Sequence, residues 1–305
     1  MTDSGGLAQR QNSPTSIVLL RAIAVAHRQA HRAHAAALLV SVAVAGLGAV
    51  SRAAPDKVGT VTLAGAVWAG VYAAVVAPWA GRHQRTSATL QEMFDVALFD
   101  LPWNRVLVGE PVAEDEWNRL SRRFRGDEAR LRDYYLVANV RSPYEVMFCL
   151  EQSLAWGSRV RQRYATLLLG LAGLWCAAGV VVTFVNGSKV VDLVSGWLVP
   201  SLGLVLFCLD QYRAQAGNTR ERKRVLDLLR AADADQAEPA LRPGPAWTAL
   251  ARQIQDVQYL MRRQQPRVPV WLFRRFHDDD MADFRFKMQV LEARVGSEPS
   301  PTPPA

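Results

Sequence analysis

The chain has 305 residues, of which 50% are hydrophobic and 21% are charged, and its formal net charge is +8 at pH 7. The hydrophobic residues gather in four nearly charge-free stretches, which excludes an ordinary soluble globular protein and a disordered chain. Three cysteines exclude a disulfide-rich scaffold, because their number is odd and two of them lie inside apolar stretches. We therefore expect a reduced, cytosol-facing context.

The N-terminal part of the chain predicts a membrane hairpin that is entered through a helix. Residues 1–15 are polar and predict a disordered start, and the Ala-rich residues 16–32 predict a juxtamembrane helix. The apolar stretches 33–51 and 58–81 have 19 and 24 residues, and a membrane-spanning helix needs about 20. Because only six residues separate them, we predict transmembrane hairpin 1 over residues 33–81.

A cytosolic helical segment is predicted over residues 82–163. Apolar side chains such as Leu90 and Phe94 recur there with helical spacing, so they predict one buried helix face. The pair Ser142-Pro143 is typical of a helix start, with Ser as the cap and Pro at the first position. We expect the helix that begins there to run unbroken into the third apolar stretch.

Transmembrane hairpin 2 is predicted over residues 164–209. The stretch 164–188 has 25 residues, the stretch 193–209 has 17, and four residues join them. Both lengths fit membrane-spanning helices. Pro200 interrupts the last stretch and predicts a kink, because proline cannot complete the helical hydrogen-bond ladder.

A second cytosolic helical segment is predicted over residues 210–295, followed by a polar, disordered tail at 296–305. Within the segment, Trp247, Ile254 and Met261 belong to an apolar seam with heptad spacing. The seam covers only two heptads. It is therefore compatible both with a coiled coil and with helix packing inside the domain.

The distribution of charge sets the orientation in the membrane. Of 36 Lys and Arg residues, only Arg52, Lys57 and Lys189 fall in the two tight loops, and the remainder lie on the opposite side. Positive charge is enriched on the cytoplasmic side of membrane proteins. We therefore expect a multi-pass protein of the cell inner membrane with both termini cytoplasmic.

Small residues are frequent in the predicted spans and allow helices to approach closely. We expect helix packing or gating at four glycines and one proline: Gly65, Gly70, Gly170, Gly173 and Pro200. The packing partner is either another helix of the same four-helix unit or a second subunit. The sequence leaves both possibilities open.

No catalytic, phosphate-loop or metal-binding signature is present, so we expect no enzyme activity, no cofactor and no metal. His27, His31 and His34 share one helical face, but neighbouring arginines disfavour a metal cation there. The acidic run at residues 277–280, together with Asp283, fits either a divalent-ion site or a solvated helix start.

Clusters of arginine flank the predicted spans and fit either a phosphate-bearing ligand or anionic lipid headgroups. The clusters comprise Arg122, Arg123 and Arg125, then residues 220–224, then Arg262, Arg263 and Arg267. We expect signal coupling at juxtamembrane cations on helices that continue into the last two spans. These coupling residues are Arg159, Arg161, Arg163, Arg220, Arg222, Lys223 and Arg224.

Two short motifs, in a fixed order relative to four spans, are similar to those of a known family. The first comprises Phe94-Asp95 and Pro102-Trp103-Asn104, and the second is the run from Trp156 to Ala165 before the third span. Over residues 15–290 the chain resembles the SMODS-associated four-transmembrane effectors, the S-4TM family. The resemblance implies a pore-forming effector in a bacterial conflict system, beside a nucleotidyltransferase that makes a cyclic or oligonucleotide messenger. It supplies no catalytic residue.

We therefore predict an all-α integral membrane protein with four transmembrane helices in two hairpins and a helical cytosolic domain. The leading hypothesis is an anti-phage effector that disrupts the inner membrane when a nucleotide second messenger, or its synthase, triggers it. One four-helix unit is too small to enclose a wide channel, so a pore implies a homo-oligomer in the lipid bilayer. No DNA or RNA partner is expected.

Two other function classes remain open at the level of sequence. The alternative hypothesis is a membrane-anchored, non-enzymatic adaptor or sensor, whose spans only tether a cytosolic binding domain. The third is a membrane-tethered hydrolase or nuclease that acts through the acidic residues 278–283. Replacing the spans by unrelated ones separates the first two hypotheses, because only an adaptor would still work.

Overall fold

A computed structural model describes residues 6–135, 144–155, 158–234, 245–264, 268 and 289. These residues form helices joined by loops and contain no strand, which confirms the all-α prediction. Among them, four helices are long and apolar enough to cross a membrane, as predicted. They are Pro14–Ser51, Pro55–Phe99, Val160–Val185 and Val190–Leu229.

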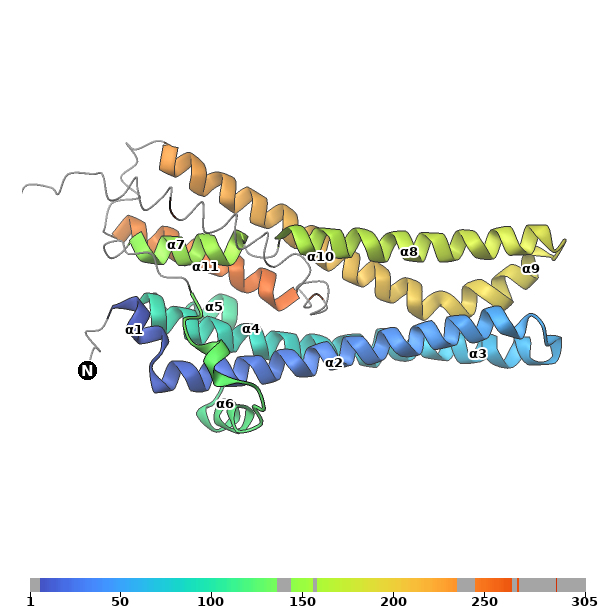
Figure 1. Cartoon of the computed structure of the whole chain (residues 1–305), viewed down its shortest axis with the longest axis horizontal. Helices are drawn as coiled ribbons and strands as arrows, with labels where there is room; N and C mark the ends of the chain where they lie inside the picture. The colour runs from blue at the N-terminus through green and yellow to red at the C-terminus, as the bar shows by residue number, and fades with distance from the viewer. Residues whose placement is uncertain are drawn as a thin grey trace, which may run out of the picture.

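The first hairpin consists of two long antiparallel helices that lie side by side (Figure 1). Helix α2 (Pro14–Ser51) forms one arm. The other arm is continuous and comprises α3 (Pro55–Val71), the π-helical turn η1 (Tyr72–Val76) and α4 (Ala77–Phe99). Asp100 ends this arm in the left-handed conformation, with φ 54°, so the chain turns away from the helix there.

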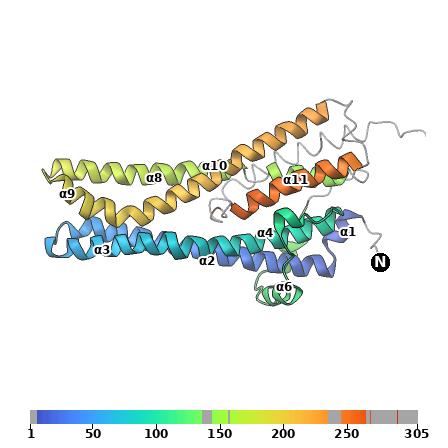
Figure 2. The ribbon, with the colours of Figure 1, turned by 180° about the vertical axis from the view of Figure 1, so that it is seen from behind.

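The second hairpin has the same plan. Helix α8 (Ser158–Val185) forms one arm, and α9 (Val190–Leu193), the π-helical turn η3 (Val194–Leu198) and α10 (Val199–Ala234) form the other. The tight turns of both hairpins lie at the same end of the molecule, as Figures 1 and 2 show.

The opposite end, here called the head, combines the outer parts of α2, α4 and α10 with shorter helices (Figure 1). These helices are α1 (Leu7–Gln11), α5 (Arg105–Val108), α6 (Glu114–Ser121), the 3₁₀ turn η2 (Glu128–Leu131), α7 (Tyr144–Ala155) and α11 (Pro245–Gln264). One hydrophobic cluster joins all of these except α5. Leu90 and Phe94 of α4 are buried in it, as their spacing predicts.

The structure shows what the heptad seam on helix α11 packs against. Trp247, Ile254 and Met261 are buried in the same hydrophobic cluster as Leu90 and Phe94. The seam therefore packs α11 within the head, rather than pairing it in a coiled coil.

The N-terminus is more ordered than the polar sequence of residues 1–15 predicts, and that expectation is corrected for residues 7–15. Leu7 of α1 is buried in the head core, and the side chain of Gln11 both donates to and accepts from the backbone of Tyr135, at 3.2 and 2.9 Å. Ser13 then caps α2 by accepting a hydrogen bond from the backbone of Ser16. These distant contacts, not local propensity, order the segment.

Several sequence-based predictions fall on residues outside the described part of the chain. They are the helix start at Ser142-Pro143, the helix junction at residues 156–157, the acidic residues 277–283 and the tail 296–305. Helices α7 and α8 lie on either side of residues 156–157, so the predicted continuity of that helix stays a prediction.

Close backbone packing and hydrogen bonds join the two hairpins within the apolar region. A Cβ added at Gly65 would fall 2.4 Å from the Cα of Pro200, so α3 and α10 touch there almost backbone to backbone. Arg52 of the first hairpin donates to Thr183 of the second at 2.9 Å, and within the first hairpin Trp68 donates to Ser41 at 2.9 Å. Such links are typical of helix packing in membranes.

The other three predicted packing glycines lie in a different environment. Gly70, Gly170 and Gly173 are exposed, and a Cβ added to any of them would meet no atom within 4 Å. Of the four glycines, Gly65 alone therefore packs inside the described four-helix unit. The others face outward, where another molecule can approach.

Candidate functional site

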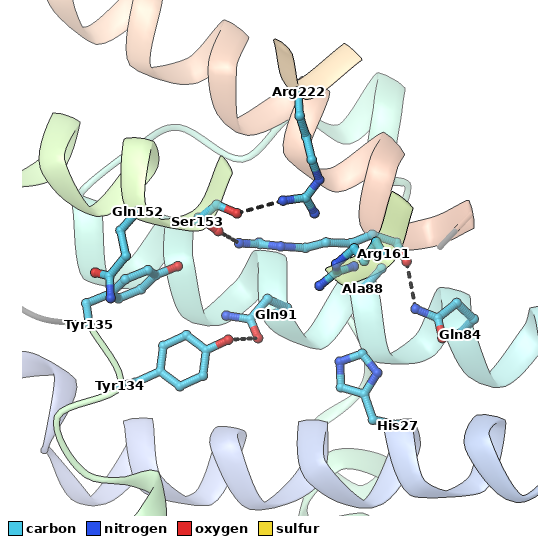
Figure 3. A pocket seen from close by; sticks show the side chains of 11 residues that line it. His27, Gln84, Ala88, Gln91, Tyr134, Tyr135, Gln152, Ser153, Arg161 and Arg222 are labelled. Atoms are coloured by element: carbon cyan, nitrogen blue, oxygen red, sulfur yellow. Dashed lines mark hydrogen bonds between the residues drawn. The ribbon is translucent and has the colours of Figure 1, made fainter. Parts of the chain in front are cut away.

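The head encloses a pocket of about 270 Å³ where the four long helices converge (Figure 3). Its lining comprises His27 of α2, Gln84, Ala88 and Gln91 of α4, Tyr134 and Tyr135 after η2, Gln152 and Ser153 of α7, Arg161 of α8, Arg222 of α10, and Arg262 of α11. Each of the four helices that can cross a membrane therefore contributes at least one side chain to the pocket.

Asp95 organises the polar core beside this pocket. Its carboxylate is fully buried and accepts hydrogen bonds from the Tyr135 hydroxyl at 2.8 Å and from Gln91 at 3.0 Å. It also pairs with the guanidinium of Arg262. Burial alone would lower the pKa of Arg262, but the charge of Asp95 raises it above its ordinary value. Arg262 therefore stays charged, and its pairing with Asp95 fixes α11 against α4.

A second buried ion pair lies one helical turn away. The guanidinium of Arg252 donates to Glu92 at 2.5 Å, and Gln255 donates to Glu92 at 2.8 Å and to Asp95 at 3.0 Å. Burial raises the pKa of Glu92, and Arg252 opposes that shift. Because unpaired buried charges are costly, this arrangement requires α4 and α11 to stay in register.

Most residues of the first family-like motif contact this core. The ring of Phe94 packs edge-on against Tyr134, with ring centroids 5.5 Å apart. The carbonyl oxygen of Pro102 accepts from Arg252 at 3.1 Å, and Asn104 donates to Asp256 at 3.0 Å. The indole of Trp103 donates to the carbonyl of Gly109, at 2.9 Å, in the loop that follows. Phe94, Asp95, Pro102 and Asn104 therefore connect distant parts of the head, while Trp156 lies outside the described residues.

Positive charge dominates the pocket. Arg222 is only 5% exposed, and it donates to the carbonyl oxygens of Ser153 and Leu154 at 3.0 and 2.9 Å. Burial lowers the pKa of Arg222, and the charges of Arg161 and Arg262 lower it further. Among the described residues that line the pocket there is no carboxylate. A bound anion would therefore relieve the repulsion between these guanidinium groups.

The structure brings two of the seven predicted coupling residues into one site. Arg161 and Arg222 line the pocket. Exposed positions are taken by Arg163, Arg220, Lys223 and Arg224, and the side chain of Arg159 is outside the described part. Arg224 pairs with Glu221 at 2.7 Å instead. Juxtamembrane position alone thus does not distinguish the buried cations from the solvated ones.

Sequence patterns placed Asp95 in a family-like motif and Arg262 in a basic cluster, but they revealed neither Glu92 nor the buried ion pairs that these residues form. One signal was available, because Glu92 and Asp95 flank Phe94 on a helix whose apolar face is buried. Acidic residues are rarely buried without a partner. They therefore pointed to cations elsewhere in the chain, although not to particular ones.

A metal site is not found among the residues that the structure describes: no group of three His, Cys, Asp or Glu side chains could hold an ion there. Of the histidines that share a helical face, His27 lines the pocket and His34 lies 3.3 Å from the Gln211 amide. The acidic residues 277–283 are not among the described residues.

These features define a helical, multi-pass membrane protein whose four long helices meet at one basic pocket. The family described as the SMODS-associating 4TM effector domain matches residues 6–291. Since the match covers nearly the whole chain, the chain belongs to this family, as its motifs predicted.

A similar protein from a bacterium supports the same class of protein. A probable CBASS effector molecule from Bacillus cereus (strain VD146) is 23% identical over 209 residues, which cover 66% of this chain and 70% of that relative. No solved structure matches the chain. Together, the family and the relative support an effector of a bacterial conflict system.

Proposed function

We propose that the chain is a membrane effector that opens a pore in the bacterial inner membrane when a nucleotide messenger fills the basic pocket. The observation that carries this proposal is that all four helices able to cross the membrane line the same pocket. A ligand there contacts every span through a continuous or nearly continuous helix. The family and the CBASS relative support a bacterial conflict system as the setting, and we propose that a nucleotide synthase acts upstream in it.

The chemistry of the pocket favours a phosphate-bearing ligand with bases. Arg161, Arg222 and Arg262 place three guanidinium groups at the pocket, and a guanidinium matches the charge and geometry of phosphate oxygens. Tyr134, which is 41% exposed, offers an aromatic ring to bases, as aromatic residues do in proteins that bind single-stranded nucleic acids. The amides of the lining can read base edges, since an amide both donates and accepts.

The size of the pocket links binding to movement. A volume of about 270 Å³ lies below the range of roughly 300–1,000 Å³ that is typical of sites for drug-sized ligands. A cyclic oligonucleotide therefore enters fully only if the helices around the pocket separate. We propose that this separation moves α8 and α10 against α2 and α4, and that it is transmitted along the helices into the membrane.

The pore itself requires several copies of the chain. We propose that both termini and the head lie in the cytosol, as the positive-inside rule favours, and that the protein acts as a homo-oligomer. The outward-facing Gly70, Gly170 and Gly173 support close contact between subunits, since small residues let membrane helices approach. The described chemistry of the site does not call for an enzyme activity.

The test is leakage of a dye and of ions from liposomes that hold the purified protein, with a panel of cyclic oligonucleotides. We expect one nucleotide to start leakage, and empty liposomes with the same nucleotide serve as the control. Tight liposomes with every nucleotide, although the protein is inserted and folded, would reject the pore. The membrane-anchored adaptor would then be the better explanation.

A further inference from the structure

A second, separate pocket lies beside α6, outside the head core, and has a volume of about 460 Å³. Its lining comprises Gln29 of α2, then Trp79, Arg82, His83 and Thr86 of α4, then Glu116, Arg119 and Leu120 of α6, and Arg123 just after α6. It shares no lining residue with the first pocket. The proposed messenger site leaves it unexplained.

The pocket lies where α4 leaves the predicted membrane span. Trp79 is near the end of the apolar stretch 58–81 and Arg82 directly follows it. The Trp79 side chain is 43% exposed and packs edge-on against His83, with ring centroids 4.9 Å apart. Tryptophan and arginine are enriched at the level of the lipid headgroups. The pocket therefore lies at the predicted membrane border, next to α6, which packs beside the outer part of α2 (Figure 1).

The charges that line this pocket are not balanced by protein partners. Arg82, Arg119 and Arg123 face one lining acid, Glu116, so the formal surplus is two positive charges. Within the described part of the chain, none of the three guanidinium groups has an ion pair or a side-chain hydrogen bond. This contrasts with Arg252 and Arg262, which are held by carboxylates.

The lining residue His83 and the nearby Val75, which does not line the pocket, suit a phosphate with an attached apolar chain. Burial lowers the pKa of His83, and the charge of Arg82 lowers it further, so the imidazole is neutral at pH 7 and can donate one hydrogen bond. On the membrane side, Val75 is 59% exposed one turn before Trp79 on the same arm, and thus offers an apolar track. Phosphate oxygens and acyl chains would then meet matching surfaces at the same place.

We infer that this pocket binds the phosphate headgroup of an anionic phospholipid, held by Arg82, Arg119 and Arg123, with its acyl chains along α4 and the preceding turn. The lipid joins α6 to two helices that cross the membrane, and so fixes the head relative to the bilayer surface. Free inorganic phosphate shares the headgroup chemistry but not the apolar contact. The site does not depend on the messenger, and it is distinct from the proposed pore.

The experiment uses the full-length protein in a neutral detergent, without nucleotide. Thermal unfolding is followed as phosphatidylglycerol, phosphatidylcholine with the same acyl chains, or inorganic phosphate is added. Arg119→Gln with Arg123→Gln is the test variant. Its matched control is Arg122→Gln with Arg125→Gln, which removes the same charge from exposed positions of the same segment outside the pocket.

We expect phosphatidylglycerol to raise Tm in the wild type and the control, and phosphatidylcholine and phosphate to have little effect. The half-saturating phosphatidylglycerol concentration should rise about 30-fold in the test variant, given that each arginine near a membrane surface contributes about a factor of five. Arg82→Gln, which changes a third lining residue on another helix, should weaken binding in the same direction.

Three results would each overturn the inference. An equal Tm shift with phosphatidylglycerol and with phosphatidylcholine would show that the protein does not recognise the headgroup. Equal losses in the test and control variants would show diffuse surface charge instead of a site. An equal Tm shift with inorganic phosphate at the lipid concentration would show a free-anion site. Each substituted residue is exposed. The Tm of each variant without lipid shows whether that variant folds as the wild type does.

Discussion

Gly65 and Pro200 touch almost backbone to backbone: a Cβ at position 65 would lie 2.4 Å from the Cα of Pro200 and 3.0 Å from its nitrogen. Gly48 of α2 approaches the same proline, since its added Cβ would lie 2.5 Å from the Cβ of Pro200. The π-helical turn η3 ends two residues before Pro200, as is common where the helical ladder is interrupted. The two hairpins therefore pack directly against each other at this proline.

Gly65→Ala should destabilise the protein, because the new methyl group meets backbone atoms that cannot rotate away. We expect a loss of about 1–3 kcal/mol, typical of overpacking. Gly59→Ala is the control on the same helix, where a Cβ meets nothing and alanine improves helix propensity by about 1 kcal/mol. Thermal unfolding in detergent measures both, and equal Tm values for the two variants would contradict the packing described here.

Asp95→Asn should be more damaging, because it leaves the buried Arg262 without its carboxylate. Breaking a buried ion pair from one side costs about 3–5 kcal/mol. Asp100→Asn provides the control five residues along, since Asp100 is exposed and its left-handed conformation suits asparagine. Denaturant unfolding checks the difference, and a loss below about 1 kcal/mol for Asp95→Asn would mean that the pair is solvated.

Glu92 gives a pH dependence with a definite sign. Burial raises its pKa in the folded protein above the ordinary 4.5, so the folded state binds this proton more readily than the unfolded state. Its contribution to stability is therefore fully present below pH 4.5 and is lost as pH rises through the folded pKa. The difference in unfolding free energy between wild type and Glu92→Gln should fall over that window. A difference that rises with pH would show that the attraction of Arg252 outweighs burial.

The spans could be predicted from the sequence, but the polar core of the head could not. A bilayer imposes a length on an uncharged helix, and that length can be counted along the chain. The partners of Asp95 and Glu92 are Arg262 and Arg252, which lie 167 and 160 residues further along. Helical periodicity shows which face is buried, but it does not show which distant helix covers it.

The same limit applies to the pocket and to the N-terminus. Arg161 and Arg222 were predicted from their position beside the spans, whereas their convergence with Arg262 depends on how three helices pack. Residues 7–15 were expected to be disordered because they are polar. Their order comes from Tyr135, whose backbone pairs with Gln11 across 124 residues. Local composition carries no information about such a partner.

Arg161 and Arg163 separate a ligand contact from general juxtamembrane charge, because they lie two residues apart on α8. Arg161 lines the basic pocket, and Arg163 is exposed outside it. With the nucleotide that starts leakage in the wild type, Arg161→Gln should raise the half-activating concentration about 10- to 100-fold, as expected for losing hydrogen bonds to a charged group. Arg163→Gln should change it little, although it removes the same charge.

Two measurements keep that comparison interpretable. Unfolding of both variants without nucleotide shows whether either change disturbs the head, and flotation with liposomes shows whether both insert. If the two variants respond to the nucleotide alike while both fold and insert, then charge near the membrane is what matters and the pocket is not the trigger. If only Arg161→Gln responds weakly, the ligand acts between α8 and α10, because Arg161 and Arg222 line the same pocket from those two helices.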